Sequence, residues 1–459
     1  MPSSDTSPAE LTDTLTGLPG RSEFCRDLDG RVQQLMRDGR DAAVLRLDLD
    51  RFGRLNESFG TEVGDTVLRR VAQCLRESVP NAGALARLGD DEFALSIEGV
   101  DPGSVRLIAE ELLRTIQRRI RVAEMPLGIT ASIGVCMMRD CSGAQADPLR
   151  NADLALREAK QRGRNSCVFF QPAMETQRSA RTTLEASLRR ALEQKEFRLH
   201  YQPQLDLQTG AIIGAEALLR WMDPLRGVVP PGAFISVAEN AGLITPIGEW
   251  VIREVCRQQA RRVAGGLVVV PIAVNVSALQ FHDPGFADLI ATELRVRHLD
   301  GAPLSLEITE SVLMRDAEVV ERTMRQLATL GVRLALDDFG TGFSSLAYLK
   351  SLPLYRLKID RCFISGLPDS VHDAAIVRAV LSLAAHLGVE VVAEGVETVA
   401  QAQFLREHGC HIAQGFLWGQ PLTRRDFQLM LTDVAAPLRT QVGATSTVIA
   451  DSRPRRIRA

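Results

Sequence analysis

The sequence predicts an α/β protein of two domains, the first built on a mixed sheet and the second a TIM-like barrel of eight strands. Three observations support this prediction. The length of 459 residues exceeds that of one ordinary domain. The second half alternates short apolar runs with helical patterns, as a (β/α)8 barrel requires. Acidic residues recur near the ends of several runs, where the active sites of such barrels lie.

The N-terminal half has the signals of a mixed α/β domain over residues 9–170. Its strand candidates are 44–52, 84–97 and 128–138, and its helical patterns are 64–79 and 105–120. Residues 174–197 keep helical spacing without glycine or proline. We therefore expect a connecting helix over 171–196.

The C-terminal half predicts a barrel over residues 197–432. Its strand candidates are 198–205, 212–219, 268–276, 304–309, 333–339, 356–359, 389–396 and 411–418. Helical patterns at 247–263, 317–331 and 372–388 separate several of these strands. Residues 433–459 are rich in small and basic residues, and we expect them to form a disordered basic tail.

Composition excludes several classes of protein. The net charge of −3 argues against binding of a nucleic acid polymer. The sequence has no secretory signal and no apolar stretch long enough for an integral membrane segment, so we expect a cytoplasmic protein. Its eight cysteines include no CxxC pair, which predicts reduced thiols and neither a disulfide framework nor a zinc site.

Carboxylates near the strand ends predict a metal site. They are Glu216, Glu307, Asp337, Asp338 and Glu394. At one end of a barrel they would converge, and they would repel one another unless cations held them. Together with the amide of Asn275 they are hard oxygen ligands suited to Mg²⁺ or Mn²⁺, while Lys358 offers a counter-charge or a donor to water. A single such acid is more often a helix cap or an ion-pair partner; the full set favours a hydrolytic site.

The motifs in the second half resemble those of a known family. Its segments AEALLRW, NVSALQF, LEITE, DDFGTGFSSL, LKID, AEGVE and QGFLWGQPL resemble, in this order, the EAL domain family of cyclic di-GMP phosphodiesterases. Upstream, the segments DTLTGLPGR, LDLDRFGRLNESFG, RLGDDEF and NADLALREAKQRGRN resemble the GGDEF family of diguanylate cyclases, whose domain is palm-like. The two resemblances cover roughly residues 10–432.

The EAL resemblance implies hydrolysis of cyclic di-GMP to linear pGpG by water, assisted by two Mg²⁺ or Mn²⁺ ions, in a protein that forms homodimers through the barrel. The implied metal ligands are Glu216, Asn275, Glu307, Asp337, Asp338 and Glu394. The implied catalytic residues are Glu216, Lys358, Glu394 and Asp338, and the implied substrate contacts are Gln202, Leu218, Arg220 and Gln414. Glu310 matches a glutamate that steadies the loop containing Asp338.

The GGDEF resemblance is less complete. Asp90 replaces the second glycine of the signature and adds bulk and negative charge beside a triphosphate, and Gly53 and Thr61 also depart from the family pattern. A possible GTP–Mg²⁺ site is retained at Asp48, Asn56, Asp65, Asp91, Glu92, Lys160 and Arg164. We expect a degenerate domain that binds GTP and regulates a phosphodiesterase. For this domain the alternatives are an inert relic and an active cyclase, which would make the protein bifunctional. For the whole protein a further alternative is a non-catalytic cyclic di-GMP receptor.

Overall fold

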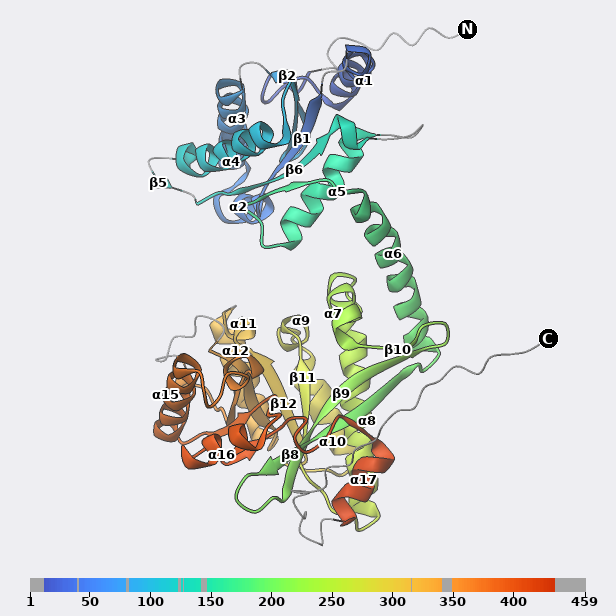
Figure 1. Cartoon of the computed structure of the whole chain (residues 1–459), viewed down its shortest axis with the longest axis vertical. Helices are drawn as coiled ribbons and strands as arrows, with labels where there is room; N and C mark the ends of the chain where they lie inside the picture. Colours follow the sequence, from blue (N-terminus) through green and yellow to red (C-terminus); the bar gives the residue numbers. More distant parts are fainter. Residues whose placement is uncertain are drawn as a thin grey trace, which may run out of the picture. The chain divides into compact units, whose positions relative to one another are not determined.

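The chain divides between Thr182 and Thr183 into two units, Met1–Thr182 and Thr183–Ala459 (Figure 1). The computed structural model describes residues 12–38, 41–79, 82–122, 125–126, 128–141, 147–314, 316–340 and 349–433. The predicted basic tail, apart from its first residue, lies outside these residues. So do residues 341–348, which include the second part of the DDFGTGFSSL segment.

The first unit is built from a mixed sheet with helices on both faces. Its elements are α1 (Arg21–Asp38), β1 (Ala42–Leu49), α2 (Phe52–Phe59), α3 (Thr61–Ser78), β2 (Ala82–Gly89), β3 (Glu92–Glu98), α4 (Pro102–Arg119), β4 (Arg121–Val122), β5 (Met125–Pro126), β6 (Ala131–Met137), a 3₁₀ turn (Met138–Asp140), α5 (Pro148–Gln161) and β7 (Cys167–Phe169). Helix α6 (Pro172–Glu193) crosses into the second unit, where a connecting helix was predicted.

The sheet of the first unit has the order β2-β3-β1-β6-β7, with only β6 and β7 parallel among its described pairings. Side chains alternate between its two faces, as the period of two in a strand requires. Leu45 and Leu47 pack with apolar residues of α3 and α4, whereas Val44 packs with residues of α1 and α5 on the other face. Each face of the sheet therefore has its own hydrophobic core.

One predicted strand of the first unit is a hairpin. The run 84–97 contains two antiparallel strands, β2 and β3, joined by a turn at Asp90 and Asp91. The Arg87 guanidinium donates to the carbonyl oxygen of Asp90 at 2.6 Å and holds this turn closed. Apolar residues continue on both sides of the turn, so the apolar pattern by itself predicts a single strand. The short strand β7 was not predicted.

The second unit contains the barrel. Its elements are β8 (Phe197–Asp206), β9 (Ile212–Asp223), β10 (Gly227–Val229), α7 (Pro231–Asn240), α8 (Ile244–Ala264), β11 (Ile272–Val276), α9 (Ala278–Phe281), α10 (Phe286–Val296), β12 (Leu304–Thr309), α11 (Glu310–Leu313), α12 (Ala317–Thr329), β13 (Arg333–Phe339), β14 (Arg356–Ile359), α14 (Arg361–Ile364), α15 (Val371–Leu387), β15 (Glu390–Ala393), α16 (Val399–Glu407), β16 (Ile412–Ala413), β17 (Leu422–Thr423) and α17 (Arg424–Asp433).

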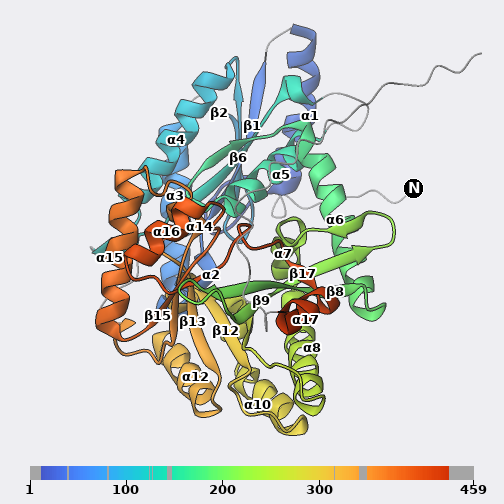
Figure 2. The same ribbon diagram turned by 60° about the horizontal axis from the view of Figure 1, so that its bottom comes forward.

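Eight strands close the barrel in the order β9-β11-β12-β13-β14-β15-β16-β8, and β8 pairs back to β9. Figure 2 shows these strands with helices such as α8, α10, α12 and α15 around them. The chain thus has the predicted TIM-like barrel, and a large core lies between its strands and helices. Among the described residues, no helix is long and apolar enough to cross a bilayer.

The barrel departs from the expectation of parallel strands at β8, which is antiparallel to both β9 and β16. The connection between β8 and β9 is a tight turn, in which the Asp206 carboxylate accepts from the Thr209 amide at 2.7 Å and Gly210 has a φ of 72°. A parallel crossover needs about a dozen residues, which this turn lacks. Gln202 on β8 therefore lies directly opposite Glu216 on β9.

All eight cysteines lie in the described part of the chain. Five of them are buried, including Cys136 and Cys141. The sulfur atoms of Cys136 and Cys141 lie 3.2 Å apart within the core of the first unit, where α5 packs on the sheet.

Candidate active site

Four carboxylates from four strands converge on one lysine near the carboxyl end of the barrel. The Nζ atom of Lys358 on β14 lies 2.5 Å from Glu394, 2.6 Å from Glu307, 3.2 Å from Asp337 and 3.8 Å from Glu216. Glu307, Asp337 and Lys358 lie within the last three residues of consecutive parallel strands, and Glu394 directly follows β15. Four of the five predicted acids therefore form one cluster.

The cluster has an excess of negative charge in a buried place. Lys358 and Glu307 are each 1% exposed. Burial alone would lower the pKa of Lys358, but the four carboxylates hold that pKa well above its usual range. Burial raises the pKa of Glu394 to about 7, and the charges of Glu216 and Asp337 add to this effect against the opposing charge of Lys358. The single ammonium group of Lys358 therefore cannot neutralise the charge of four carboxylates.

This imbalance indicates that the residues fit divalent cations. Oε1 of Glu394 is a buried atom that forms an ion pair with Nζ of Lys358 and has no other polar partner among the described residues. Carboxylate oxygens of this kind are the ligands that Mg²⁺ and Mn²⁺ prefer. In the described part of the chain, no three acidic, histidine or cysteine side chains form a ready-made ligand group. The Lys358 ammonium lies among the carboxylates.

Amide side chains complete the contacts of Glu216. Nδ2 of Asn275 donates to one carboxylate oxygen at 2.6 Å, and Nε2 of Gln414 donates to the other at 2.6 Å. Gln414 also donates to Oε1 of Gln202 at 3.0 Å. Three residues predicted for ligand or substrate binding are therefore in contact with Glu216 or with each other.

A buried polar chain that the sequence analysis missed extends from Gln414 to the opposite end of the barrel. Nε2 of Gln204 donates to Oε1 of Gln414 at 3.1 Å, and the guanidinium of Arg356 donates to Oε1 of Gln204 at 2.9 Å. Arg356 in turn pairs with Glu390 at 2.7 Å. The strand period could have identified both residues. Gln204 lies two positions after Gln202, and Arg356 lies two positions before Lys358, so each shares a strand face with a predicted site residue.

Gln204 is expected to be a positioning residue for Gln414 and Glu216. The variant Gln204→Leu should lower kcat/KM by about 10- to 100-fold and raise the divalent-ion concentration needed for half-maximal activity. Steady-state kinetics over a metal titration would measure both effects. Gln259→Leu is the matched control, because Gln259 is also 1% exposed but hydrogen-bonds the carbonyl oxygens of Val270 and Pro303. Equal kinetic losses in both variants would contradict a positioning role.

Asp338 lies beside the cluster in a restrained backbone. Its φ of 54° is left-handed. Burial raises the pKa of Asp338, and the charges of Asp337 and Asp360 raise it further. Oε1 of Glu310 accepts a hydrogen bond from the Gly340 amide at 2.9 Å. This contact lies at the start of the loop that Glu310 was predicted to steady, and the role itself stays a prediction.

The predicted substrate contacts on β9 share one face of the strand. Glu216, Leu218 and Arg220 follow one another at intervals of two, so their side chains point to the same side. Burial lowers the pKa of Arg220, and the negative charge of Glu216 opposes that shift. Its guanidinium donates to the carbonyl oxygen of Leu219 at 3.0 Å. This row leads from the carboxylate cluster toward the end of β9.

The first unit brings together part of its predicted nucleotide site. Nζ of Lys160 on α5 lies 2.6 Å from Asp48 on β1, and Glu92 on β3 is paired with Asp48 across the sheet. Burial and the charge of Asp48 raise the pKa of Asp91 to about 6. Arg46, which was not predicted, pairs with Glu92 at 2.6 Å. It lies two positions before Asp48, on the same strand face.

The other predicted nucleotide contacts are not joined to this group. In the described residues, no hydrogen bond or ion pair links Asn56, Asp65 or Arg164 to Asp48 or Lys160. Oδ1 of Asn56 is buried without a partner in this part of the chain. A methyl group added at Gly64 would lie 2.0 Å from it. The start of α3 thus approaches Asn56 closely. The role of Asn56 in binding GTP stays a prediction.

Comparison with known families agrees with this architecture. The EAL domain family model matches residues 185–421. The model described as "Diguanylate cyclase, GGDEF domain" matches residues 10–166. The chain therefore belongs to the EAL domain family, and a GGDEF domain precedes its EAL domain.

Two named bacterial proteins are among the relatives of this chain. The "Bifunctional diguanylate cyclase/cyclic di-GMP phosphodiesterase MucR" of Pseudomonas aeruginosa is 43% identical over 412 residues, which are 90% of this chain and 60% of that protein. The "Cyclic di-GMP phosphodiesterase NbdA" of the same organism is 36% identical over 432 residues, which are 93% of this chain and 55% of that protein. The chain thus spans less than two thirds of either relative.

A solved structure is similar to the second unit. It is described as "PaMucR Phosphodiesterase, c-di-GMP complex" and is 48% identical, with a TM-score of 0.52. The match covers 53% of this chain and 99% of that chain.

Proposed function

We propose that the EAL domain hydrolyses cyclic di-GMP to linear pGpG. The observation that carries this proposal is the convergence of four carboxylates on Lys358 near the carboxyl end of the barrel. A phosphodiester is already anionic, so attack on it requires charge neutralisation at such a place. The names of MucR and NbdA support the same substrate and reaction.

The residues of the site would have three roles, which are metal binding, orientation of water and positioning of Glu216. The residues that would hold two Mg²⁺ or Mn²⁺ ions are Glu216, Asn275, Glu307, Asp337, Asp338 and Glu394. Such ions, when bound, would neutralise phosphate charge and lower the pKa of the attacking water. Lys358 would donate a hydrogen bond that orients this water, since its ammonium lies within 4 Å of four of the carboxylates. Asn275 and Gln414 hold both oxygens of Glu216 in place.

Substrate binding is assigned to the row of side chains beside the cluster. Arg220 would pair with a phosphate, Leu218 would contact a base, and Gln202 and Gln414 would donate or accept hydrogen bonds. Both glutamines already contact each other, so they are positioned as a pair. Homodimerisation through the barrel and a cytoplasmic location stay predictions.

For the GGDEF domain we propose GTP binding that regulates the phosphodiesterase. The grouping of Asp48, Glu92 and Lys160 supports a site for a nucleotide with its metal ion. Asp90 lies exposed in the turn between β2 and β3, where its charge would oppose a triphosphate. The bifunctional alternative is favoured by the name of MucR. A receptor without activity is disfavoured, because every predicted ligand position is filled.

Product analysis tests the proposal directly. The purified chain is incubated with cyclic di-GMP and Mg²⁺ or Mn²⁺, with and without GTP, and the nucleotides are separated by chromatography. We expect linear pGpG from cyclic di-GMP and no cyclic product from GTP. Intact cyclic di-GMP despite tight binding would make the barrel a receptor, and formation of cyclic di-GMP from GTP would make the chain bifunctional.

The arm with GTP tests regulation. We expect saturating GTP to change the rate of pGpG formation and the variant Lys160→Met to lose this response, because Lys160 is the cation beside Asp48. Arg162→Met is the control, since Arg162 is an exposed cation on the same stretch of chain and pairs with Glu158. Kinetics that GTP leaves unchanged would count against a regulatory site.

A further inference from the structure

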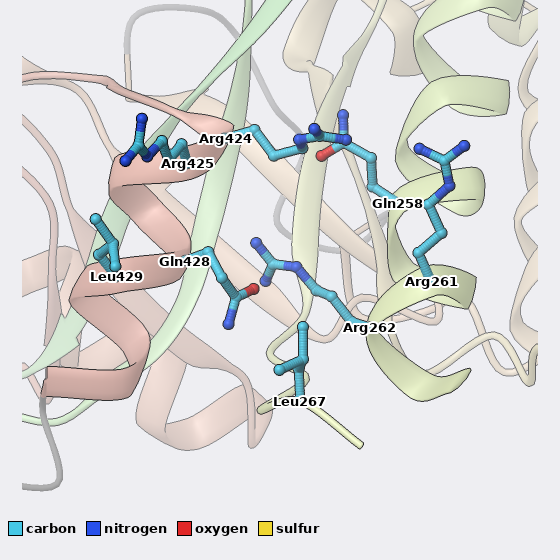
Figure 3. A pocket seen from close by; sticks show the side chains of 8 residues that line it. All are labelled: Gln258, Arg261, Arg262, Leu267, Arg424, Arg425, Gln428 and Leu429. Atoms are coloured by element: carbon cyan, nitrogen blue, oxygen red, sulfur yellow. The ribbon is translucent and has the colours of Figure 1, made fainter. Parts of the chain in front are cut away.

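A cavity of the EAL domain away from the carboxylate cluster is lined by arginines. It has a volume of about 410 Å³ and lies between α8 and α17. Figure 3 shows its lining, with Arg262, Arg424 and Gln428 extending into the space between the two helices. The residues that line it are Gln258, Arg261, Arg262, Leu267, Arg424, Arg425, Gln428 and Leu429. Four are cationic and none is acidic.

The central arginine is buried without an anionic partner. Arg262 is 5% exposed, and its NH1 atom makes no hydrogen bond to any described residue. None of the four arginines forms an ion pair within the described part of the chain, in contrast to Arg257 one turn earlier, which pairs with Glu254 at 2.5 Å. Burial lowers the pKa of Arg262, and the positive charge of Arg424 lowers it further. Such a charge is costly to bury unless an anion meets it.

Arg262 has an aromatic contact beside its unpartnered NH1 donor. Its guanidinium carbon lies 5.0 Å from the ring centre of Phe427. That interaction offsets part of the cost of burial and fixes the plane of the group, but it uses the ring face and none of the N–H donors. Nε2 of Gln428 is also buried without a partner among the described residues. The lining of this cavity thus contains two buried donors without a partner among the described residues.

The cavity is separate from the carboxylate cluster. Tyr201 on β8 donates to Oε1 of Gln258 at 2.7 Å, and its ring stacks on Phe427 at 5.5 Å. Its neighbour Gln202 points to the other side of β8, where it contacts Gln414. The strand therefore has the arginine cavity on its outer side and the candidate active site on its inner side.

We propose that this cavity binds a phosphate group of a small molecule. Guanidinium groups match the oxygens of a phosphate and bind them through paired hydrogen bonds, and the Gln428 amide adds a further donor. Leu267 and Leu429, which are 43% and 52% exposed, border the cavity and would contact an apolar part of the ligand. This site is independent of the proposed hydrolysis.

The test is calorimetric titration of the full chain with inorganic pyrophosphate, in metal-free buffer of low ionic strength. We expect saturable binding that weakens by at least ~10-fold in the double variant Arg424→Gln/Arg425→Gln. Both residues are exposed, so the fold should tolerate the change. Arg378→Gln, an exposed arginine on α15, is the matched control and should bind as the unaltered chain does. A second variant, Arg262→Met, removes the buried guanidinium.

Three results would overturn the proposal. The first is the absence of saturable binding, and the second is binding that persists unchanged in the double variant. The third comes from a parallel arm with phosphatidylcholine vesicles, with and without phosphatidylglycerol. If binding that depends on Arg424 and Arg425 appears only on the anionic vesicles, the surface contacts lipid headgroups and no soluble phosphate ligand. Loss of pyrophosphate binding with unchanged hydrolysis of cyclic di-GMP would keep the two sites distinct.

Discussion

Replacing Glu216 by glutamine is expected to lower kcat for cyclic di-GMP hydrolysis by at least ~1,000-fold, which corresponds to about 4 kcal/mol of transition-state stabilisation. The side chain keeps its size, so the barrel should stay intact. It loses the negative charge that would hold a divalent ion. It also presents an NH₂ group to one of two amide donors, Asn275 and Gln414, that now donate to the carboxylate.

Single-turnover assays of pGpG formation would measure this loss, and thermal unfolding would verify the fold. Glu318→Gln is the matched control, since Glu318 is an exposed acid on α12 of the same domain. We expect it to retain full activity. Activity of Glu216→Gln within tenfold of the unaltered chain would remove Glu216 from the metal site and with it the central part of the proposed function.

Replacing Lys358 by methionine is expected to destabilise the metal-free protein by roughly 3–5 kcal/mol, because it leaves three buried carboxylates and the half-buried Glu394 without their cation. Added Mg²⁺ or Mn²⁺ should stabilise this variant more than it stabilises the unaltered chain, since a bound cation would replace the missing charge. Hydrolysis should fall by at least ~100-fold even at saturating metal, because the donor to water is lost.

Urea unfolding with a chelator and over a series of metal concentrations would measure the first two effects independently of activity. Lys195→Met, at an exposed lysine, is the control and should change neither quantity. If metal stabilises Lys358→Met and the unaltered chain equally, the carboxylates around Lys358 are not the place where metal binds. Lys358 would then be a structural counter-charge alone.

Much of the barrel and its acids could be predicted because two local rules act together. A buried parallel strand is a short apolar run, and residues at its carboxyl end lie at the open end of the barrel. These rules place Glu307, Asp337 and Glu394 near one another without any coordinates. They failed for β8, whose direction depends on the length of the turn before β9, and for the hairpin of β2 and β3, whose apolar pattern continues on both sides of the turn.

The chemical identity of the cluster was already present in the chain, because the residue types and their positions along each strand fix which groups reach the end of the barrel. The partners within it depend on the closed barrel. Strand tilt and closure decide that Lys358 lies among four carboxylates, that Gln204 and Arg356 extend a polar chain behind Gln414, and that Arg262 and Arg424 meet across two helices. Those contacts join residues far apart in sequence, and their distances follow from packing that no local pattern encodes.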